Sequence, residues 1–307
     1  MPDAFIFACP VCRATLAPVA TGQLHCPADG RVYLQVDGIW RFLPPEREPV
    51  FAQFIREYET VRRAEGRGSA DPAYYRALPF CDLTGCRPAD WQVRARSFAT
   101  WVQQVVTQLQ REVGRPLAIL DLGAGNGWLS YRLARQGHHL AAVDLAANAV
   151  DGLGAHVHYD VPFTPVQAEF DSLPFAAGQA DLVIFNASLH YTPDYATTLR
   201  EAFRVVNTNG KVAVVDTPVY HDTASGRQMV QEREANYQQR YGFPSNAIAA
   251  ENYLTYERLA SLAQALNVHW YLRWPEPRWR WTLRRWRACL RRHREPAHFP
   301  MIIGERI

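Results

Sequence analysis

Short hydrophobic runs alternate with helix-type hydrophobic patterns through the middle of the chain. The runs at residues 117–120, 140–143 and 182–185 predict buried strands, because each is largely hydrophobic and is bounded by turn-forming residues. Apolar side chains that recur on one face predict helices at residues 128–136 and 195–206. Strands that alternate with helices in this way indicate an α/β fold, in which helices cover both faces of a mostly parallel sheet.

The regions on either side of this alternation predict further elements. Residues 91–113 predict a helix, since their apolar side chains fall on one helical face. Residues 218–254 have no clear core pattern and are interpreted as an inserted lid. The other predicted elements are a turn at 207–210, a strand at 211–215, a helix at 256–266, and strands at 268–272 and 299–303.

Composition divides the chain into three parts. Residues 1–45 contain a cysteine cluster and two short strand-like stretches, and the proline-rich stretch 44–49 is typical of a boundary between modules. Residues 46–112 are interpreted as a helical linker and lid. Residues 113–307 are predicted to form the main domain, with insertions at 218–254 and 275–297.

The overall composition excludes several classes of protein. Hydrophobic residues make up 48% of the 307 positions, which supports a large core and argues against intrinsic disorder. The net charge of +3 argues against a simple polycationic binder. The first residues do not resemble an export signal, and no stretch reaches the roughly 18 apolar residues of a membrane helix, so a cytoplasmic location is expected. Six cysteines are too few for a disulfide scaffold.

The most informative motif is a glycine-rich turn after the strand at residues 117–120. Asp121 ends that strand, and Gly123, Gly125 and Gly127 complete the pattern D-x-G-x-G-x-G. A dinucleotide-binding loop of the G-x-G-x-x-G type would need a wider final spacing. The motif and the chain through residue 215 resemble the class I S-adenosylmethionine-dependent methyltransferases. This resemblance implies a Rossmann-like domain with a mostly parallel seven-stranded sheet, and S-adenosylmethionine as the cofactor.

Several further residues gain roles from this resemblance. Asp144 ends the next predicted strand, where a carboxylate can accept hydrogen bonds from both ribose hydroxyls of the cofactor. The resemblance implies that Glu169 binds the adenine amino group, with Asp171 as the alternative, and that Phe170 contacts the ring through its backbone. The implied cofactor-binding residues are Asp121, Gly123, Ala124, Gly125, Asn126, Asp144, Leu145, Glu169, Phe170, Asp171, Asn186 and Ala187.

Methyl transfer requires few catalytic side chains, because the leaving group of the donor is already activated. His190 is the candidate general base, and a structural role for it is equally compatible with the sequence. The loop at 186–189 lacks the Pro-Pro-aromatic and Pro-Cys sequences of enzymes that methylate nucleic acid bases, and it resembles loops of the ubiquinone and menaquinone group. A small organic acceptor is therefore the first hypothesis. Four residues that could contact an acidic substrate, although no spacing assigns them, are Arg62, Arg67, Tyr74 and Arg94.

The cysteine segment has the spacing of a zinc site. Cys9 and Cys12 form one C-x-x-C pair, and Cys26 and Asp29 have the same separation. Residues 8–43 resemble small zinc-ribbon proteins that activate tRNA and protein methyltransferases, which implies one structural zinc. The alternative is a metal-free ribbon with buried cysteines. A cysteine ribbon ahead of a methyltransferase domain also resembles the rRNA guanine methyltransferases, although Asp29 stands where those proteins usually have histidine.

Residues 278–294 keep alternative functions open. This stretch holds eight arginines, three tryptophans and no acid, a composition compatible with binding RNA, an anionic membrane surface, or solvent alone. An RNA methyltransferase is therefore the second hypothesis. A cofactor-binding module that activates or scaffolds a partner enzyme is the third. The sequence does not predict the oligomeric state.

Overall fold

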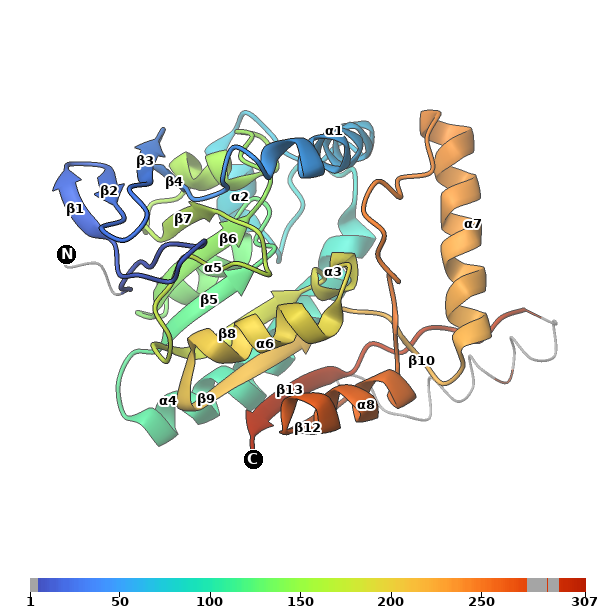
Figure 1. Cartoon of the computed structure of the whole chain (residues 1–307). Coiled ribbons are helices and arrows are strands. Elements are labelled where there is room, and N and C mark those ends of the chain that lie inside the picture. The colour runs from blue at the N-terminus through green and yellow to red at the C-terminus, as the bar shows by residue number, and fades with distance from the viewer. Residues whose placement is uncertain (1–4, 275–285, 287–292) are drawn as a thin grey trace.

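A mixed sheet of 11 strands forms the centre of the molecule (Figure 1). The structure is a computed structural model that describes residues 5–274, 286 and 293–307. The strand order across the sheet is β1-β2-β3-β4-β7-β6-β5-β8-β9-β13-β12. Among the described residues, no helix is sufficiently long and apolar to span a bilayer.

Seven of these strands make up the predicted main sheet. Parallel pairing joins β7 to β6, β6 to β5, β5 to β8 and β8 to β9, while β13 runs antiparallel to both β9 and the edge strand β12. The bounds are Thr164–Gln167 for β7, His139–Asp144 for β6, Ala118–Leu122 for β5, Ala180–Asn186 for β8, Val206–Val215 for β9, Met301–Arg306 for β13 and Val268–Arg273 for β12. The strands predicted from hydrophobic runs are thus confirmed in type and order.

Helices cover both faces of this sheet. Successive residues of β8 point to opposite faces, so that Val183 joins the core under α6 and α8, while Leu182 joins the core under α3 and α5. The helices are α1 Glu48–Ala64, α2 Pro72–Ala77, α3 Pro88–Trp101, α4 Thr107–Val113, α5 Trp128–Ala134, α6 Tyr195–Val205, α7 Thr223–Tyr241 and α8 Tyr256–Leu266. Shorter helical turns are η1 Val102–Val106, η2 Leu153–His158 and η3 Leu189–Tyr191, and a small parallel sheet pairs β10 Val219–Tyr220 with β11 Leu254–Thr255.

One of the sequence-based expectations is wrong in detail. The predicted turn at 207–210 lies inside β9, because the strand starts directly after α6 and absorbs these residues through an irregular register opposite Ala180 and Leu182. The predicted helix at 91–113 is confirmed as one unbroken helical segment, in which α3 continues through the π-helical turn η1 into α4.

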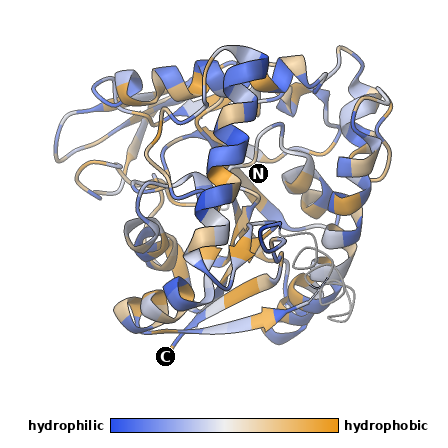
Figure 2. Cartoon of the chain, turned by 90° about the vertical axis from the view of Figure 1, so that its right-hand side faces the viewer, coloured by the Kyte–Doolittle hydropathy of each residue, from blue (hydrophilic) through white to orange (hydrophobic). Residues whose placement is uncertain are grey.

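The interpreted lid at 218–254 contains the long helix α7. Asp222 caps this helix by accepting a hydrogen bond from the backbone N–H of Ser225 at 2.7 Å. Only Ser225 and Gly226 of α7 are buried, so the helix needs no hydrophobic stripe and leaves no core pattern in the sequence. Figure 2 shows α7 in front of the molecule, largely hydrophilic along its length.

The cysteine segment extends the main sheet. Its strands are β1 Ala17–Ala20, β2 Gln23–His25, β3 Val32–Val36 and β4 Ile39–Arg41. Strand β4 pairs in parallel with β7, with Trp40 opposite Val166. Phe7 and Phe42 pack with Phe175 of the main domain in one continuous core. The segment is therefore built into the same sheet and core as the main domain (Figure 1).

Candidate functional site

Three adjoining cavities lie at the carboxyl ends of β5, β6 and β8, the usual ligand edge of a parallel sheet. The large cavity, about 260 Å³, is lined by Phe51, Phe54, Tyr58, Asp144, Leu145, Glu169, Phe170, Asp171, Ala187 and Tyr191, among others. The loop cavity, about 40 Å³, is lined by Tyr58, Arg62, Arg94, Asp121, Gly123, Ala124, Gly125, Asn126, Asn186 and Ala187, among others. The arginine cavity, about 240 Å³, is lined by Phe54, Tyr58, Arg62, Glu65, Arg67, Arg94, Ala187, His190, Tyr191, Arg233 and Tyr237, among others.

All the residues that the sequence implied for cofactor binding line the large cavity or the loop cavity. They come from the carboxyl ends of β5, β6 and β8 and from the segment after β7. Tyr58 and Ala187 line all three cavities, so the cavities are contiguous around these two side chains. Ala187 has a left-handed backbone, with φ of 55°, a conformation that only surrounding structure can hold for a non-glycine residue.

The glycine turn brings backbone close to the following loops. Gly123 has φ of +79°, and a Cβ on it would lie 2.3 Å from the Cβ of Ser188. The N–H of Gly125 donates to Asp144 at 2.8 Å, and the N–H of Ala146 donates to the other oxygen of the same carboxylate at 2.8 Å. These bonds hold Asp144 at the border of the large cavity, and each carboxylate oxygen retains a lone pair for a ligand.

Asp121 is a buried carboxylate with an unused oxygen. The side chain is 1% exposed, and its Oδ2 accepts a hydrogen bond from the Ser130 hydroxyl at 2.8 Å. Its Oδ1 is buried and has no hydrogen-bond partner in the described part of the chain. Burial raises the pKa of Asp121 to about 7. A cationic or hydrogen-bond-donating ligand in the loop cavity would satisfy this oxygen.

The two acids after β7 are already engaged. Arg47, just before α1, donates from Nε and Nη2 to the two oxygens of Glu169 at 2.9 and 2.6 Å. Asp171 accepts a hydrogen bond from the Thr198 hydroxyl, and burial raises its pKa. Glu169 therefore faces the large cavity as half of an ion pair, a feature that sequence reasoning missed because Arg47 lies outside the motif region.

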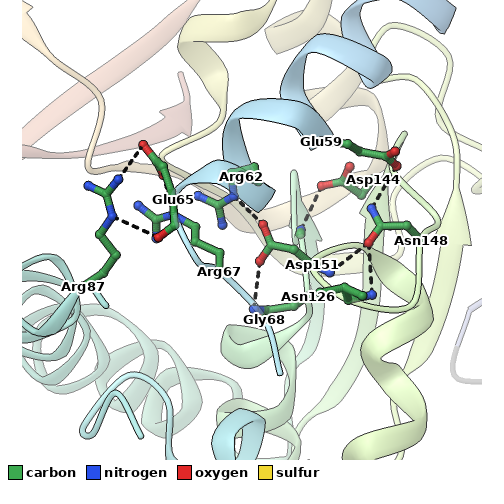
Figure 3. Close-up of polar contacts among 12 residues, drawn as sticks. Glu59, Arg62, Glu65, Arg67, Gly68, Arg87, Asn126, Asp144, Asn148 and Asp151 are labelled. Atoms are coloured by element: carbon green, nitrogen blue, oxygen red, sulfur yellow. Dashed lines mark hydrogen bonds and ion pairs between the residues drawn. The ribbon is translucent and has the colours of Figure 1, made fainter. Parts of the chain in front are cut away.

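Helix α1 covers the cavities. Its inward residues recur at helical spacing, from Phe51 and Phe54 to Tyr58 and Arg62. Figure 3 shows the polar contacts that fasten this helix: Arg62 pairs with Asp151, which also accepts from Asn126 at 3.3 Å. In the same network Asn148 donates to Glu59 at 2.9 Å. Helix α1 lies within residues 46–112, which the sequence predicts to form a helical linker and lid.

His190 lies in η3 and lines the arginine cavity. Its Nδ1 is 3.5 Å from the Thr217 hydroxyl, and its ring packs against Tyr191 with centroids 4.4 Å apart. Burial, reinforced by the positive charges of Arg233 and Arg94, lowers the pKa of His190 to about 3. The imidazole is therefore neutral near pH 7 and able to accept a hydrogen bond, but it is a weak base in the ligand-free protein.

Three of the four residues suggested for an acidic substrate line the arginine cavity. Arg62 lies in α1, Arg94 in α3, and Arg67 in the connection after α1. Tyr74 is buried elsewhere, in α2, where its hydroxyl accepts a hydrogen bond from the N–H of Gly68 at 3.3 Å. Sequence reasoning missed Arg233 and Tyr237, which α7 adds to the same cavity from a distant part of the chain.

The four residues of the suggested zinc site come together. Potential ligand atoms of Cys9, Cys12, Cys26 and Asp29 all lie within 4.8 Å of one another. The Cys12 and Cys26 sulfurs are 3.3 Å apart, and the Cys9 sulfur is 3.1 Å from Asp29. Tetrahedral ligands about 2.0–2.3 Å from zinc would lie roughly 3.3–3.8 Å from one another, so small adjustments would accommodate the ion.

Two matching turns build this cluster. Arg13 and Gly30 follow the second ligand of each pair and both have left-handed backbones, with φ of 67° and 75°. Their N–H groups donate to the carbonyls of Cys9 and Cys26 at 2.9 and 3.0 Å. The two turns thus present their side chains to a common centre.

The arginine-rich stretch at 278–294, by contrast, lies largely outside the described residues.

Comparison with known proteins agrees with this geometry. Residues 120–214 match a family model described as "Methyltransferase domain". These residues form the parallel, Rossmann-like part of the sheet. The matched residues run from β5 through β9 and include all of the implied cofactor-binding positions.

Curated relatives match over the same part of the chain. A malonyl-[acyl-carrier protein] O-methyltransferase from Hahella chejuensis is 34% identical over 113 residues, covering 36% of this chain and 40% of the relative. A demethylmenaquinone methyltransferase from Corynebacterium urealyticum is 36% identical over 103 residues, covering 33% of this chain and 43% of the relative. The chain thus spans less than half the length of these relatives.

Two methyltransferases are among the solved structures that are similar to this chain. A 1,6-didemethyltoxoflavin-N1-methyltransferase from Burkholderia thailandensis, with bound S-adenosylhomocysteine, has a TM-score of 0.46 and 17% identity and covers 95% of this chain and 98% of its own. An S-adenosylmethionine-dependent methyltransferase from Mesorhizobium loti has a TM-score of 0.44 and 16% identity and covers 62% of this chain and 91% of its own.

Proposed function

We propose that this protein is an S-adenosylmethionine-dependent methyltransferase that acts on a small organic acceptor. The observation that carries the proposal is the convergence of the implied cofactor-binding residues on two contiguous cavities at the ligand edge of the sheet. The match of residues 120–214 to a methyltransferase domain supports it independently of the cavity geometry.

The residues present fit this cofactor. Asp121 lines the loop cavity, and its unused oxygen would accept a hydrogen bond from the ammonium group at the methionine end. Asp144 retains lone pairs for the ribose hydroxyls at the border of the large cavity. The apolar walls of that cavity, which include Phe51 and Phe170, suit the adenine ring. Glu169, which Arg47 holds at this cavity, would accept a hydrogen bond from the adenine amino group, with Asp171 as the alternative.

The chemistry asked of the protein is mainly positioning. When bound, S-adenosylmethionine supplies a methyl group on a positively charged sulfur, which keeps the electron pair of the broken S–C bond as the acceptor atom forms its bond to the same carbon. Tyr58 and Ala187 lie where the cavities meet and would fix the line of approach between donor and acceptor. His190 would accept a hydrogen bond from the acceptor, whose proton leaves to solvent as the product forms.

The acceptor is proposed to bind in the arginine cavity. This cavity of about 240 Å³ shares Ala187 with both cofactor cavities and is close to the size of sites for small molecules, ~300 Å³ and above. The names of the curated relatives point to varied acceptors, including an acyl-carrier-bound malonyl group and a demethylmenaquinone. An RNA substrate would need, in addition to a pocket for the base, a basic surface that contacts the backbone.

Calorimetric titration with S-adenosylmethionine and S-adenosylhomocysteine, with NADH as the control, tests the cofactor. We expect micromolar binding of the first two and none of NADH, and a loss of about tenfold or more in affinity for Asp144→Ala, since two charge-assisted hydrogen bonds are removed. A folded protein that binds neither compound would contradict the proposal and favour a scaffolding role. RNA binding that weakens steeply with salt would favour the RNA alternative.

The cysteine cluster is proposed to hold one structural zinc. Three thiolates and one carboxylate form a closed four-ligand set with no position left for substrate. The hydrogen bond from the N–H of Val11 to the Cys9 sulfur, at 3.4 Å, would stabilise the thiolate form. Because β4 of the same segment pairs with β7, which precedes Glu169, the metal would act by stiffening one wall of the large cavity.

A further inference from the structure

The arginine cavity carries more positive than negative charge. Four arginines line it, Arg62, Arg67, Arg94 and Arg233, against one carboxylate, Glu65. Two of these cations are neutralised by nearby acids. Arg62 pairs with Asp151, and Arg67 pairs with Glu65 at 2.7 Å and with Asp90 at 3.1 Å.

Neither Arg233 nor Arg94 forms an ion pair with an acid among the described residues, although the negative charge of Asp216 acts on Arg94. Arg233 donates from one terminal nitrogen to the side-chain oxygen of Asn252 at 3.0 Å, while its Nε and Nη2 are buried without a hydrogen-bond partner among the described residues. Within the described ranges no carboxylate lies within 4.0 Å of Arg94, whose guanidinium lies 5.3 Å from the ring centre of Trp91. Burial lowers the pKa of Arg94, and repulsion from Arg62 and Arg67 lowers it further.

The unpaired nitrogens of Arg233 have a specific shape. Nε and one terminal nitrogen form one edge of the planar guanidinium, which presents two parallel N–H groups. A carboxylate accepts both N–H groups at once through its two oxygens. Because leaving buried donors without an acceptor is unfavourable, a carboxylate that enters the cavity and accepts from them would stabilise the complex.

The other walls of the cavity are aromatic. Phe54 and Tyr58 of α1 stack with ring centroids 5.9 Å apart, and Tyr191 lies across them with its centroid 6.3 Å from that of Tyr58. Tyr237 adds a fourth ring from α7, one helical turn after Arg233. These rings offer apolar faces to a flat, unsaturated ligand body.

The two ends of the cavity face different neighbours. Ala187 and Tyr58 border the cofactor cavities, whereas Arg233 and Tyr237 line the arginine cavity alone. A ligand whose carboxylate pairs with Arg233 would therefore direct its opposite end toward Ala187. That end is where the reacting atom of an acceptor must lie.

We propose that the arginine cavity selects a small aromatic carboxylic acid as the methyl acceptor, with the carboxylate held by Arg233 and the ring held among Phe54, Tyr58 and Tyr237. This inference rests on the proposed methyltransferase function, and it adds the substrate class and the residues that select it. Arg233 acts as the specificity-determining contact because it supplies the bidentate edge.

The test compares 4-hydroxybenzoate with 4-hydroxybenzamide, two probes that share a ring and hydroxyl and differ in the charge of one group. Ligand-observed NMR on the full chain saturated with S-adenosylhomocysteine measures the affinity for each probe. We expect the acid to bind about tenfold more tightly than the amide or better, which corresponds to about 1.4 kcal/mol. Arg233→Met should remove this preference and leave the affinities for the amide and for S-adenosylhomocysteine unchanged.

Arg240→Met is the matched control, because Arg240 lies on the exposed side of the same helix and outside the cavities. The control should keep the preference for the acid. Equal affinities for the two probes in the unmodified protein, or no binding of the acid at millimolar concentration, would overturn the inference, and this comparison stands even if Arg233→Met fails to fold. Failure of S-adenosylhomocysteine to bind would instead contradict the proposed function.

Discussion

Replacing Asp121 with asparagine is expected to stabilise the ligand-free protein at alkaline pH and to weaken its binding of S-adenosylmethionine. The asparagine keeps an oxygen for the hydrogen bond from Ser130 but carries no charge. Because Asp121 is 1% exposed and one of its oxygens has no partner among the described residues, its ionised form is poorly solvated in the folded state. A bound cationic ligand would restore that solvation, so the same residue should destabilise the free protein and stabilise the complex.

The size of the effect follows from the pKa. Burial raises the pKa of Asp121 from 3.8 to about 7. One pKa unit corresponds to about 1.4 kcal/mol, so the ionised side chain lowers the free energy of unfolding by up to about 4 kcal/mol at pH 8. The folded protein is therefore most stable with Asp121 protonated. This stability is fully present below pH 3.8 and is lost as the pH rises through about 7. The advantage of Asp121→Asn should therefore grow from near zero at pH 4 to its full value at pH 8.

Urea unfolding of both proteins at pH 4.5, 6 and 8 measures this difference, and calorimetry at pH 8 measures binding of S-adenosylmethionine. We expect Asp121→Asn to lose about tenfold or more in affinity, the usual contribution of a charge-assisted hydrogen bond. Ser130→Ala is the companion variant, since it keeps the charge and removes the bond that lowers the pKa, and so should steepen the pH dependence. A stability difference between Asp121→Asn and the unmodified protein that does not change with pH would refute this reasoning.

Further outcomes test other parts of the structure. Gly123→Ala should lower the melting temperature and abolish cofactor binding, because a Cβ would lie 2.3 Å from a neighbouring carbon. The control Gly137→Ala has a similar positive φ and no atom within 4 Å of the new Cβ, so it should lower the free energy of unfolding by only about 1 kcal/mol. Equal losses of stability in the two variants would contradict the close approach at Gly123. Metal analysis should find one zinc per chain. The zinc should be lost in Cys12→Ser and kept in Cys81→Ser, because Cys81 lies outside the cluster. Zinc retained in both variants would rule out the proposed ligand set. Burial and nearby arginines lower the pKa of His190 to about 3. Its imidazole should therefore stay neutral when NMR spectra are followed from pH 8 to pH 5. A titration midpoint near pH 6.5 would show instead that the cavity is open to water.

The central sheet was predictable because its signals are local. Each strand buried on both faces reads as a continuous hydrophobic run, and the glycine turn after β5 is dictated by positive φ angles at Gly123, Gly125 and Gly127. The suggested cofactor contacts could be placed for the same reason, since parallel strands end at one edge and their following loops meet there. The sequence alone did not show that Arg47 holds Glu169, because that pairing joins residues far apart in the chain.

Helix α7 was harder to predict because it has no hydrophobic stripe. Helix α7 buries little more than Ser225 and Gly226, so its 19 residues resemble a polar loop. The turn expected at 207–210 failed for a related reason. Turn-forming residues such as Asn209 and Gly210 are common in turns, but here pairing with β8 holds them in β9.

The buried charges around Ala187 give the free protein an electrostatic pattern that matches its proposed ligands. Among the residues described, Asp121 of the loop cavity has a carboxylate oxygen without a partner, and Arg233 of the arginine cavity has a guanidinium edge without a partner. A donor with positive charge and an acceptor with negative charge would each neutralise one of them. Removing either charge should therefore weaken one ligand and spare the other, while making the empty protein more stable. A site that had evolved only to stabilise the fold would show the opposite result, since its charges would already be paired.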